Sequence, residues 1–383
     1  MLAPRPFSPW TKLTCFYRRY GIVCTCCALL HYFQMRFIHF FGRQHHTRIT
    51  DSSKRNVLFV TFSYASESKR YRVEHLREYL SNTQIKNDVV FVEDLERSWS
   101  YALSFKIIVI SHLPLDDRLQ RFVDEVKKGG QTLVYSMDDP LFLSDVMRTY
   151  FRLPPEFGER EKQFYYAEAD MRLALLKQCD CFIASTDYLA NQVRALSIPA
   201  YIIRNGFSQE MVEISKRVLD SRHRGNDNGK NDERVVIGYF SGTRTHNFDF
   251  TFVTEALLRI LKEYPNVVLR IYGYLDVDPR FKGFKRQIQR HALVRWEKLP
   301  YEIAKVDINI APLELDSGLT EPKSEIKYTE AALLKVPTVA SATDTYCYAI
   351  QHGVTGFLAR TDEDWHAYLS LLIDNVDVRG QMG

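Results

Sequence analysis

Residues 235–250, "VVIGYFSGTRTHNFDF", decide the fold class of this chain. A short apolar run ends in a turn that contains Gly242, and the apolar residues after the turn recur at helical spacing. A buried strand that leads through a glycine turn into a helix is the repeating unit of α/β proteins. The same unit begins earlier in the chain with "NVLFVTFSY" at 56–64. We therefore expect parallel sheets covered by helices on both faces.

The alternation of strands and helices occurs twice. With 383 residues, 45% of them hydrophobic and 26% charged, the chain has the composition of a soluble globular protein and exceeds the usual size of one core. A polar stretch at 221–234, rich in Gly, Asn and Asp, separates the two series and is typical of a linker or loop. We predict domains at 55–208 and 234–383, a linker region at 209–233 and a leader at 1–54. Expected strands are 56–64, 88–92, 105–112, 131–140, 179–186, 200–206, 235–242, 267–273, 306–313, 337–341 and 356–359; expected helices are 68–80, 116–128, 163–177, 250–263, 281–291 and 324–335, with others from 187 and 362.

The leader differs in charge from the rest of the chain. Residues 1–50 contain seven Lys or Arg side chains and no Asp or Glu, while the remaining residues are close to neutral. This distribution argues against a nucleic-acid partner and favours an interfacial helix on an anionic membrane surface. A signal anchor, a transit peptide or an early start codon would give a similar pattern. Four of the seven cysteines lie in the leader without the spacing of a zinc site, so we expect no metal site and a reduced, cytoplasmic body.

The turn after residue 242 is one candidate site. Gly242 permits close approach of a ligand to the backbone, and Arg244 with a helix N-terminus favours an anion. His246 follows the turn and is a further candidate. The alternative is an ordinary strand-to-helix turn in which Asn247 or Asp249 caps the helix. The residues alone do not separate these two interpretations.

A second candidate is "EPKSEIKYTEAALLKVPTVAS" at 321–341. On a helix, the spacing of Lys323, Lys327 and Glu330 places them on one face. The two lysines can hold a diphosphate, and Glu330 can accept hydrogen bonds from the hydroxyls of a ribose. Glu325 points away from this face of the helix, so replacing it should do little. The alternative is a solvated cluster in which Glu321 and Glu325 compensate the lysines. Charge and periodicity leave both possibilities open.

Three stretches resemble the group 1 (family 4) retaining glycosyltransferases: "IGYFSGTRTHNFDF", "EPKSEIKYTEAALLKVPTVAS" and "GVTGFLARTDEDW". The first half is similar to a subgroup of these enzymes through "YRVEHLREYL", "VYSMDDPLF", "CDCFIASTDYLA" and "IRNGFS". The resemblance covers roughly residues 55–375. It implies the GT-B fold, in which two Rossmann-like, doubly wound domains face a central cleft that binds a nucleotide sugar.

The resemblance also implies roles for individual residues. Glu330 matches the family's ribose ligand, while Lys323 and Ser324 lie where its donor-sugar and phosphate contacts fall. Gly242 and Arg244 match its diphosphate loop. The chain departs from the family pattern in three ways. Glu321 precedes Glu330 by nine positions, whereas many members have two glutamates eight positions apart. The segment after the first strand has no Gly-Gly loop, and the given sequence does not contain the family's final crossover helix. In place of that loop, we expect Arg70, Tyr71 and Arg72 to bind the acceptor.

The catalytic candidates lie at strand ends in the first half. "SMDDP" places Asp138 and Asp139 where many family members have a histidine that faces the cleft, and His112 ends the preceding strand. Either aspartate can contact donor or acceptor, act as a base or chelate a divalent ion. The alternative is a helix cap followed by a proline.

The resemblance implies a glycosyltransferase that moves a hexose-type sugar from a nucleoside-diphosphate-sugar donor to a hydroxyl, with retention of configuration. The basic leader makes a glycan or lipid-linked acceptor the expected one. Arg and Lys are expected to stabilise the departing diphosphate, so neither a metal nor another cofactor is expected. The enzyme is expected in the cytoplasm, with a peripheral position on the membrane. The alternatives are a nucleotide-sugar epimerase or hydrolase of the same fold, and a non-catalytic relative that only binds nucleotide sugar.

Overall fold

The computed structural model describes residues 56–64, 66–152, 158–225, 234–242 and 246–383. The predicted leader at 1–54 and Arg244 lie outside these ranges. Within the described residues, none of the helices combines the length and the apolar character needed to span a membrane. The chain divides between Gly206 and Phe207 into two compact units. We call residues up to Gly206 unit 1 and residues from Phe207 unit 2.

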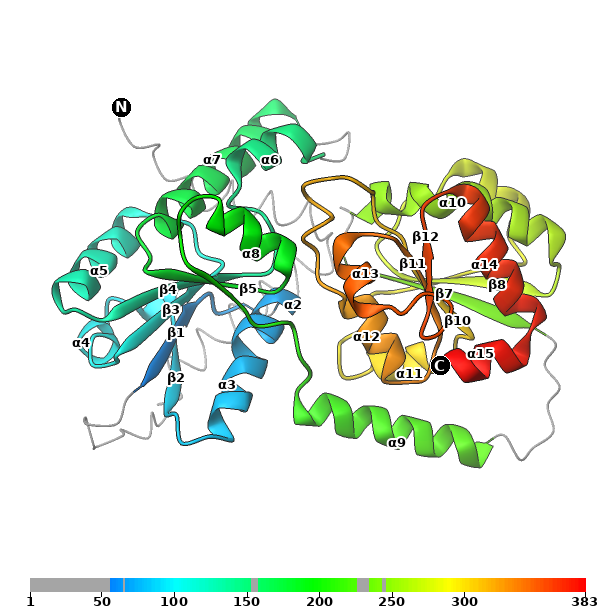
Figure 1. The fold of residues 1–383 in the computed structure, drawn as a ribbon, viewed down its shortest axis with the longest axis horizontal. Helices are drawn as coiled ribbons and strands as arrows, with labels where there is room; N and C mark the ends of the chain where they lie inside the picture. Colours follow the sequence, from blue (N-terminus) through cyan, green and yellow to red (C-terminus); the bar gives the residue numbers. More distant parts are fainter. Residues whose placement is uncertain (1–55, 65, 153–157, 226–233, 243–245) are drawn as a thin grey trace. The chain divides into compact units, whose positions relative to one another are not determined.

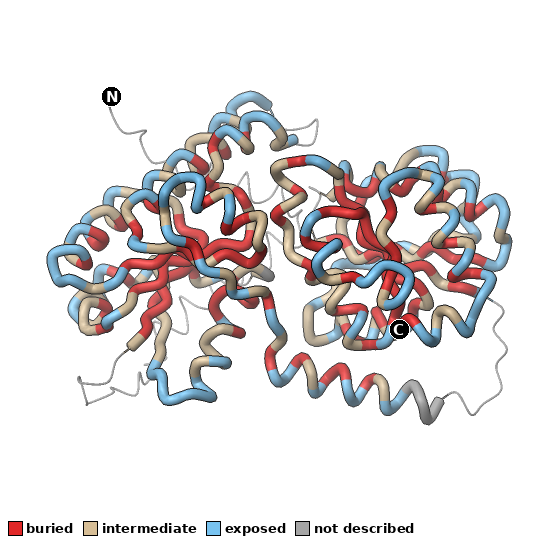
Figure 2. The backbone as a smooth tube through the Cα atoms, viewed as in Figure 1, coloured by how far each residue is buried: buried red, intermediate tan, exposed pale blue. Residues whose placement is uncertain are grey.

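Unit 1 contains a six-stranded sheet in which every pair of neighbouring strands is parallel. The strand order is β2-β1-β3-β4-β5-β6 (Figure 1). The apolar runs that indicated strands are buried in the centre of the sheet, as Figure 2 shows. The strands are β1 (Val57–Thr61), β2 (Asn87–Phe91), β3 (Ile107–Ser111), β4 (Thr132–Met137), β5 (Cys181–Ala184) and β6 (Ala200–Ile202).

Helices cover both faces of the unit 1 sheet because alternate side chains of each strand point to opposite faces. Leu58 and Val60 of β1 belong to one hydrophobic cluster, and Val57 and Phe59 belong to another. The helical elements are α2 (Glu67–Lys69), the π-helix η2 (Arg70–Glu74), α3 (His75–Ser81), the 3₁₀ helix η3 (Val92–Asp94), α4 (Trp99–Ala102), α5 (Asp117–Lys128), α6 (Ser144–Tyr150), α7 (Glu159–Leu176) and α8 (Asp187–Arg194).

Unit 2 contains a second six-stranded parallel sheet with the order β12-β11-β10-β7-β8-β9. Numbered from the first strand of the unit, this is the 3-2-1-4-5-6 order of dinucleotide-binding Rossmann folds. The strands are β7 (Val235–Ser241), β8 (Val267–Gly273), β9 (Ile288–His291), β10 (Ile308–Ala311), β11 (Thr338–Ser341) and β12 (Phe357–Ala359).

The helices of unit 2 also form two layers. Residues of α10 and α14 pack on one face of the sheet, and residues of α9, α11 and α12 form a separate cluster with Val306. The prediction of two doubly wound, Rossmann-like domains is therefore confirmed. The helical elements are α9 (Gln209–Gly225), α10 (Asn247–Glu263), η6 (Pro279–Phe284), α11 (Leu299–Ile303), α12 (Ile326–Ala332), α13 (Asp344–Ala349), α14 (Asp362–Asp374) and α15 (Val376–Met382).

Two local predictions are wrong. The helix expected at 281–291 is instead the 3₁₀ helix η6 followed by strand β9. Phe281, Phe284 and Ile288 have helical spacing, but Ile288 pairs with Leu269 of β8 at the edge of the sheet, so long-range pairing overrides the local pattern. Residues 221–225, which were expected to belong to a linker or loop, are instead the last residues of α9.

Each sheet has one point at which the strand order reverses. In unit 1 this point lies between β1 and β3, and in unit 2 it lies between β7 and β10. Ligands of open α/β sheets bind beyond the carboxyl ends of the strands at such a point. A ligand site is therefore expected at the segments that follow these four strands.

Candidate functional site

In unit 2, a buried carboxylate joins the segments that follow β7 and β10. Asp249, in the first turn of α10, lies 2.9 Å through Oδ2 from Nδ1 of His246. The same oxygen lies 3.6 Å from Nζ of Lys323, which follows β10. Asp249 is only 3% exposed. Two predicted site residues that are far apart in the sequence are thus held together by one aspartate.

The electrostatic environment fixes the charges of this cluster. Burial lowers the pKa of His246 to about 3, and the nearby positive charges of Lys323 and Lys327 act in the same direction. Burial raises the pKa of Asp249, but Lys323 and the hydrogen bond to His246 outweigh it and hold the pKa well below its usual range. At neutral pH the cluster therefore contains an ionised aspartate and a neutral imidazole.

Helix α12 contributes Lys327 and Glu330. Nζ of Lys327 donates a hydrogen bond of 2.7 Å to the carbonyl oxygen of Phe240 near the end of β7, and it lies 5.6 Å from the centre of the Tyr239 ring. Glu330 lies one turn further along the helix and is 7% exposed. The helix starts only at Ile326, so Lys323 precedes it instead of sharing its face.

The two other glutamates of this stretch have separate positions. Glu321 accepts hydrogen bonds from the backbone amides of Asp316 at 3.0 Å and Asp344 at 2.6 Å, so it connects the loop before α12 to the start of α13. Glu325 is 5% exposed at the N-cap position of α12. The solvated cluster considered for Glu321 and Glu325 therefore does not describe Glu325. Ser324, next to it, is half-buried.

In unit 1, His112 and Asp138 meet at the ends of β3 and β4. Nε2 of His112 lies 2.8 Å from Oδ1 of Asp138, and Nδ1 lies 2.9 Å from Oγ of Ser111. His112 has a left-handed backbone conformation with φ of 61°, which is costly for a residue other than glycine and occurs often at functional sites. Asp139 is half-buried beside Asp138.

The carboxyl group of Asp138 is ionised. Burial raises its pKa, but the hydrogen bond and charge of His112 and the charge of Arg72 leave the pKa below its ordinary value. Nδ2 of Asn205 donates a further hydrogen bond of 3.3 Å to Oδ2 of Asp138.

The three residues predicted to bind the acceptor are all buried. Arg72 is 0% exposed, and its guanidinium makes five hydrogen bonds, two of them to Oγ of Ser136. The other three go to the carbonyl oxygens of Ile203 (2.6 Å) and Ile183 (3.2 Å) and to Oδ1 of Asn205 (3.1 Å). These contacts connect η2 to β4, β5 and the end of the unit.

Arg70 and Tyr71 lie in the same π-helix. Nη2 of Arg70 donates a hydrogen bond of 3.3 Å to the Tyr71 hydroxyl, and its guanidinium lies 4.6 Å from the centre of the Tyr71 ring. Their role toward an acceptor stays a prediction, as does that of Arg72.

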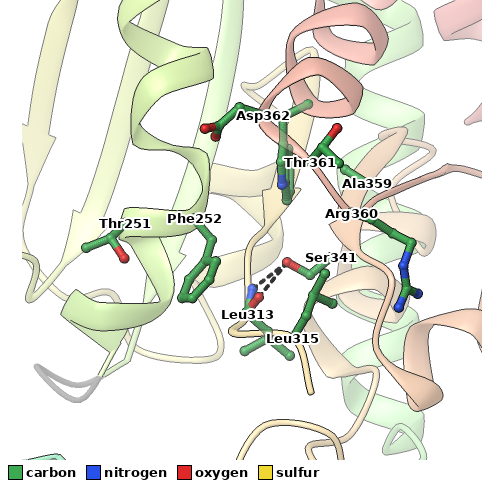
Figure 3. Close-up of a pocket in the computed structure, with 10 residues that line it drawn as sticks. Thr251, Phe252, Leu313, Leu315, Ser341, Ala359, Arg360, Thr361 and Asp362 are labelled. Atoms are coloured by element: carbon green, nitrogen blue, oxygen red, sulfur yellow. Dashed lines mark hydrogen bonds between the residues drawn. The ribbon is translucent and has the colours of Figure 1, made fainter. Parts of the chain in front are cut away.

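A pocket of about 320 Å³ opens on the α10 and α14 side of unit 2 (Figure 3). Oγ of Ser341 bonds both the amide and the carbonyl of Leu313 in its wall. Among the residues that the structure describes, no predicted donor-binding residue lines this pocket. Its wall is nevertheless close to the cluster, because Leu313 and Leu315 flank Glu314, whose backbone amide donates a hydrogen bond of 3.5 Å to Oδ1 of Asp249. Its lining residues are Thr251, Phe252, Leu313, Leu315, Ser341, Ala359, Arg360, Thr361, Asp362 and Trp365.

Sequence reasoning missed the central role of Asp249. This residue was considered only as a possible cap of α10, whereas His246 occupies the N-cap position and the Asp249 carboxylate binds side chains instead. The available signal was a carboxylate three residues after a histidine, on the same side of a helix. Within the described parts of the chain, no group of three His, Cys, Asp or Glu residues is placed to hold a metal ion.

The comparison with known protein families gives a match within unit 2. Residues 234–375 match the family described as "Glycosyl transferases group 1". This range contains the whole cluster of His246, Asp249, Lys323, Lys327 and Glu330. None of the curated proteins matches the sequence.

Solved structures resemble both units. The Anabaena protein HepE, in complex with UDP and glucose, is 13% identical with a TM-score of 0.58, and the match covers 86% of this chain and 92% of HepE. Sucrose-phosphate synthase from Thermosynechococcus elongatus is 12% identical with a TM-score of 0.56, covering 86% and 92%. A putative UDP-N-acetylglucosamine 2-epimerase from Listeria monocytogenes is 13% identical with a TM-score of 0.50, covering 86% and 90%. The chain therefore has the GT-B fold, and its second unit carries a domain that matches the group 1 glycosyltransferases.

Proposed function

We propose that this protein is a retaining glycosyltransferase that transfers a hexose-type sugar from a nucleoside diphosphate to a hydroxyl group. The observation that carries the proposal is the cluster at the switch point of unit 2, where Asp249 and Phe240 hold Lys323 and Lys327 in place. Two cations at the carboxyl end of a Rossmann-like sheet suit a diphosphate. Glu330, on the same helix as Lys327, suits a ribose.

The two lysines supply what the reaction needs most. When the bond between sugar and phosphate breaks, negative charge grows on the departing diphosphate, and fixed positive charges at that place lower the barrier. Lys327 is anchored to the backbone of β7 and Lys323 to Asp249, so both are positioned before the donor binds. In this proposal no metal is needed for that step.

We assign the acceptor to unit 1 and the catalytic contacts to His112, Asp138 and Asp139. An ionised Asp138 and a strained His112 lie at adjacent strand ends. They can orient the hydroxyl of the acceptor, or stabilise the positive charge that develops on the sugar as its bond to phosphate breaks. The basic leader leads us to propose a glycan or lipid-linked acceptor and a peripheral position on the cytoplasmic side of a membrane.

The first experiment identifies the donor. Thermal unfolding is measured with UDP-, GDP-, ADP- and TDP-sugars, because a ligand that binds the native state raises its stability by mass action. UDP-glucose is the first to try, since HepE is similar in fold and its structure contains UDP and glucose. If no nucleotide sugar shifts the transition, the proposal fails.

The second experiment distinguishes transfer from the alternative reaction. The fold is shared with a putative epimerase, so fold alone does not decide between the two. Turnover of the donor is followed with and without lipid-linked and soluble glycan acceptors. Transfer requires consumption that depends on the acceptor, whereas epimerisation or hydrolysis proceeds without one.

A further inference from the structure

We infer that Nε2 of His246 accepts a hydrogen bond from a hydroxyl group of the donor's sugar, and that Asp249 holds the imidazole ring in the orientation that this contact requires. The inference rests on the proposed function and extends it to a residue that determines sugar specificity.

The first step concerns the proton on the ring. An ionised carboxylate can only accept hydrogen bonds, so Oδ2 of Asp249, at 2.9 Å, places the imidazole proton on Nδ1 of His246. A second proton on Nε2 would put a cation next to Lys323 and Lys327, and burial and both lysines lower the pKa of the ring. Nε2 is therefore an unprotonated acceptor.

The second step excludes a phosphate as the partner of Nε2. Phosphate oxygens carry negative charge and accept hydrogen bonds, so they require donors such as Lys323 and Lys327. A neutral ring with a lone pair on Nε2 would repel them. A sugar hydroxyl can donate to this nitrogen, and the His246 side chain is 17% exposed, which leaves room for such contact.

The third step gives the place of the sugar relative to the diphosphate. In the proposed function, Glu330 holds the ribose within α12, and Lys327 and Lys323 hold the phosphates before it along the chain. His246 joins this series at the Lys323 end, because both side chains bind Asp249. The ring is therefore next to Lys323, and the proposal places the sugar on the side of this lysine that faces away from the ribose.

One test reads the tautomer without any ligand. The protein is labelled with ¹⁵N-histidine, and the signals of His246 are assigned by their loss in the His246→Asn variant. A protonated Nδ1 and an unprotonated, pyridine-like Nε2 are expected at neutral pH. The reverse tautomer, or a ring protonated on both nitrogens, overturns the inference whether or not nucleotide sugars bind.

The other test compares UDP with UDP-glucose by calorimetry. An asparagine at 246 keeps a donor for Asp249 but has no atom at the position of Nε2, so UDP-glucose should bind about tenfold more weakly, as expected for one lost hydrogen bond. UDP, which has phosphates and ribose but no sugar, should bind unchanged. His246→Gln places an acceptor near Nε2 and should recover part of the loss.

A matched control removes another histidine from a carboxylate. His366→Asn breaks the 2.7 Å contact with Glu263 in the same unit and should leave both ligands unaffected. Equal weakening of UDP and UDP-glucose in His246→Asn would make the ring a phosphate or ribose contact and overturn the inference, as would no weakening of either. If UDP-glucose does not bind the unaltered protein, the measurement is made with the nucleotide sugar found by thermal unfolding; if none binds, the proposed function and the sugar contact fail together, while the tautomer is still decided by the spectrum.

Discussion

Replacing Arg72 with methionine should destabilise unit 1 far more than unit 2. Methionine fills a similar volume but leaves the carbonyl oxygens of Ile183 and Ile203 and Oδ1 of Asn205 without the donor that Arg72 supplies. A hydrogen bond to a charged group contributes about 1.5–3 kcal/mol, and an unpaired buried acceptor costs about 1–3 kcal/mol.

The net loss is smaller than the sum of these values. Burial lowers the pKa of the Arg72 guanidinium to about 10, which shows that holding this charge inside the protein has a cost that the substitution removes. Breaking one side of a buried ionic network typically costs about 3–5 kcal/mol. We therefore expect the free energy of unfolding of unit 1 to fall by about 4 kcal/mol.

Native-state hydrogen exchange in low concentrations of urea measures this loss separately for each unit. Amides of β4 and β5 should lose about 4 kcal/mol of opening free energy, while those of β7 and β8 should change little. Arg121→Met is the matched control, since Arg121 is 62% exposed and pairs with the exposed Glu96, and it should cost less than about 1 kcal/mol. A loss below about 1 kcal/mol in β4 and β5, or an equal loss in β7 and β8, would refute the reasoning.

Three more predictions concern unit 2. Glu330→Gln should keep the fold but weaken nucleotide binding at least tenfold in calorimetry, whereas Glu321→Gln should leave affinity unchanged; equal affinities for both variants would contradict the ribose assignment. Gly273→Ala should destabilise unit 2 by at least about 3 kcal/mol in urea unfolding, because its φ is 82° and a Cβ would lie 1.9 Å from a backbone oxygen, while Gly283→Ala, with open space around it, should cost under about 1 kcal/mol. The folded pKa of His246 is lowered to about 3, so on acidification from about pH 6.5 the unfolded state binds a proton that the folded state does not, and stability should fall by about 2 kcal/mol between pH 7 and 5. His246→Asn should lack this part of the pH dependence, and identical unfolding curves against pH for both proteins would show that the ring is not held neutral.

Much of the fold follows from local patterns. The apolar runs at 56–64 and 235–242 contain β1 and β7, and the amphipathic pattern at 116–128 contains α5. Short parallel strands buried on both faces leave such continuous apolar runs, which are readable without knowledge of the partners. The order of the strands cannot be predicted from local patterns, because it depends on which strands pair across long sequence distances. The same limit explains β9, whose helical spacing is overridden by pairing with β8.

The same distinction between local and long-range contacts applies to the candidate site. Lys327 and Glu330 lie within one helix, so their common face could be predicted from spacing. The contact of Lys323 with Asp249 joins segments that follow two different strands, and nothing local in either segment indicates it. In unit 1 the pairing of His112 with Asp138 is also long-range, although both were candidates because each ends a strand.

The different strand orders of the two sheets bear on the origin of the chain. In unit 1 the third strand lies beside the first, whereas in unit 2 the third strand lies at the edge beyond the second. A tandem duplication of one ancestral gene segment would preserve the order, and moving a strand from the edge of a sheet to its centre requires the chain to be rewound. The two halves of the chain therefore differ by a rearrangement of strand order, which a simple tandem repeat of one unit would not produce.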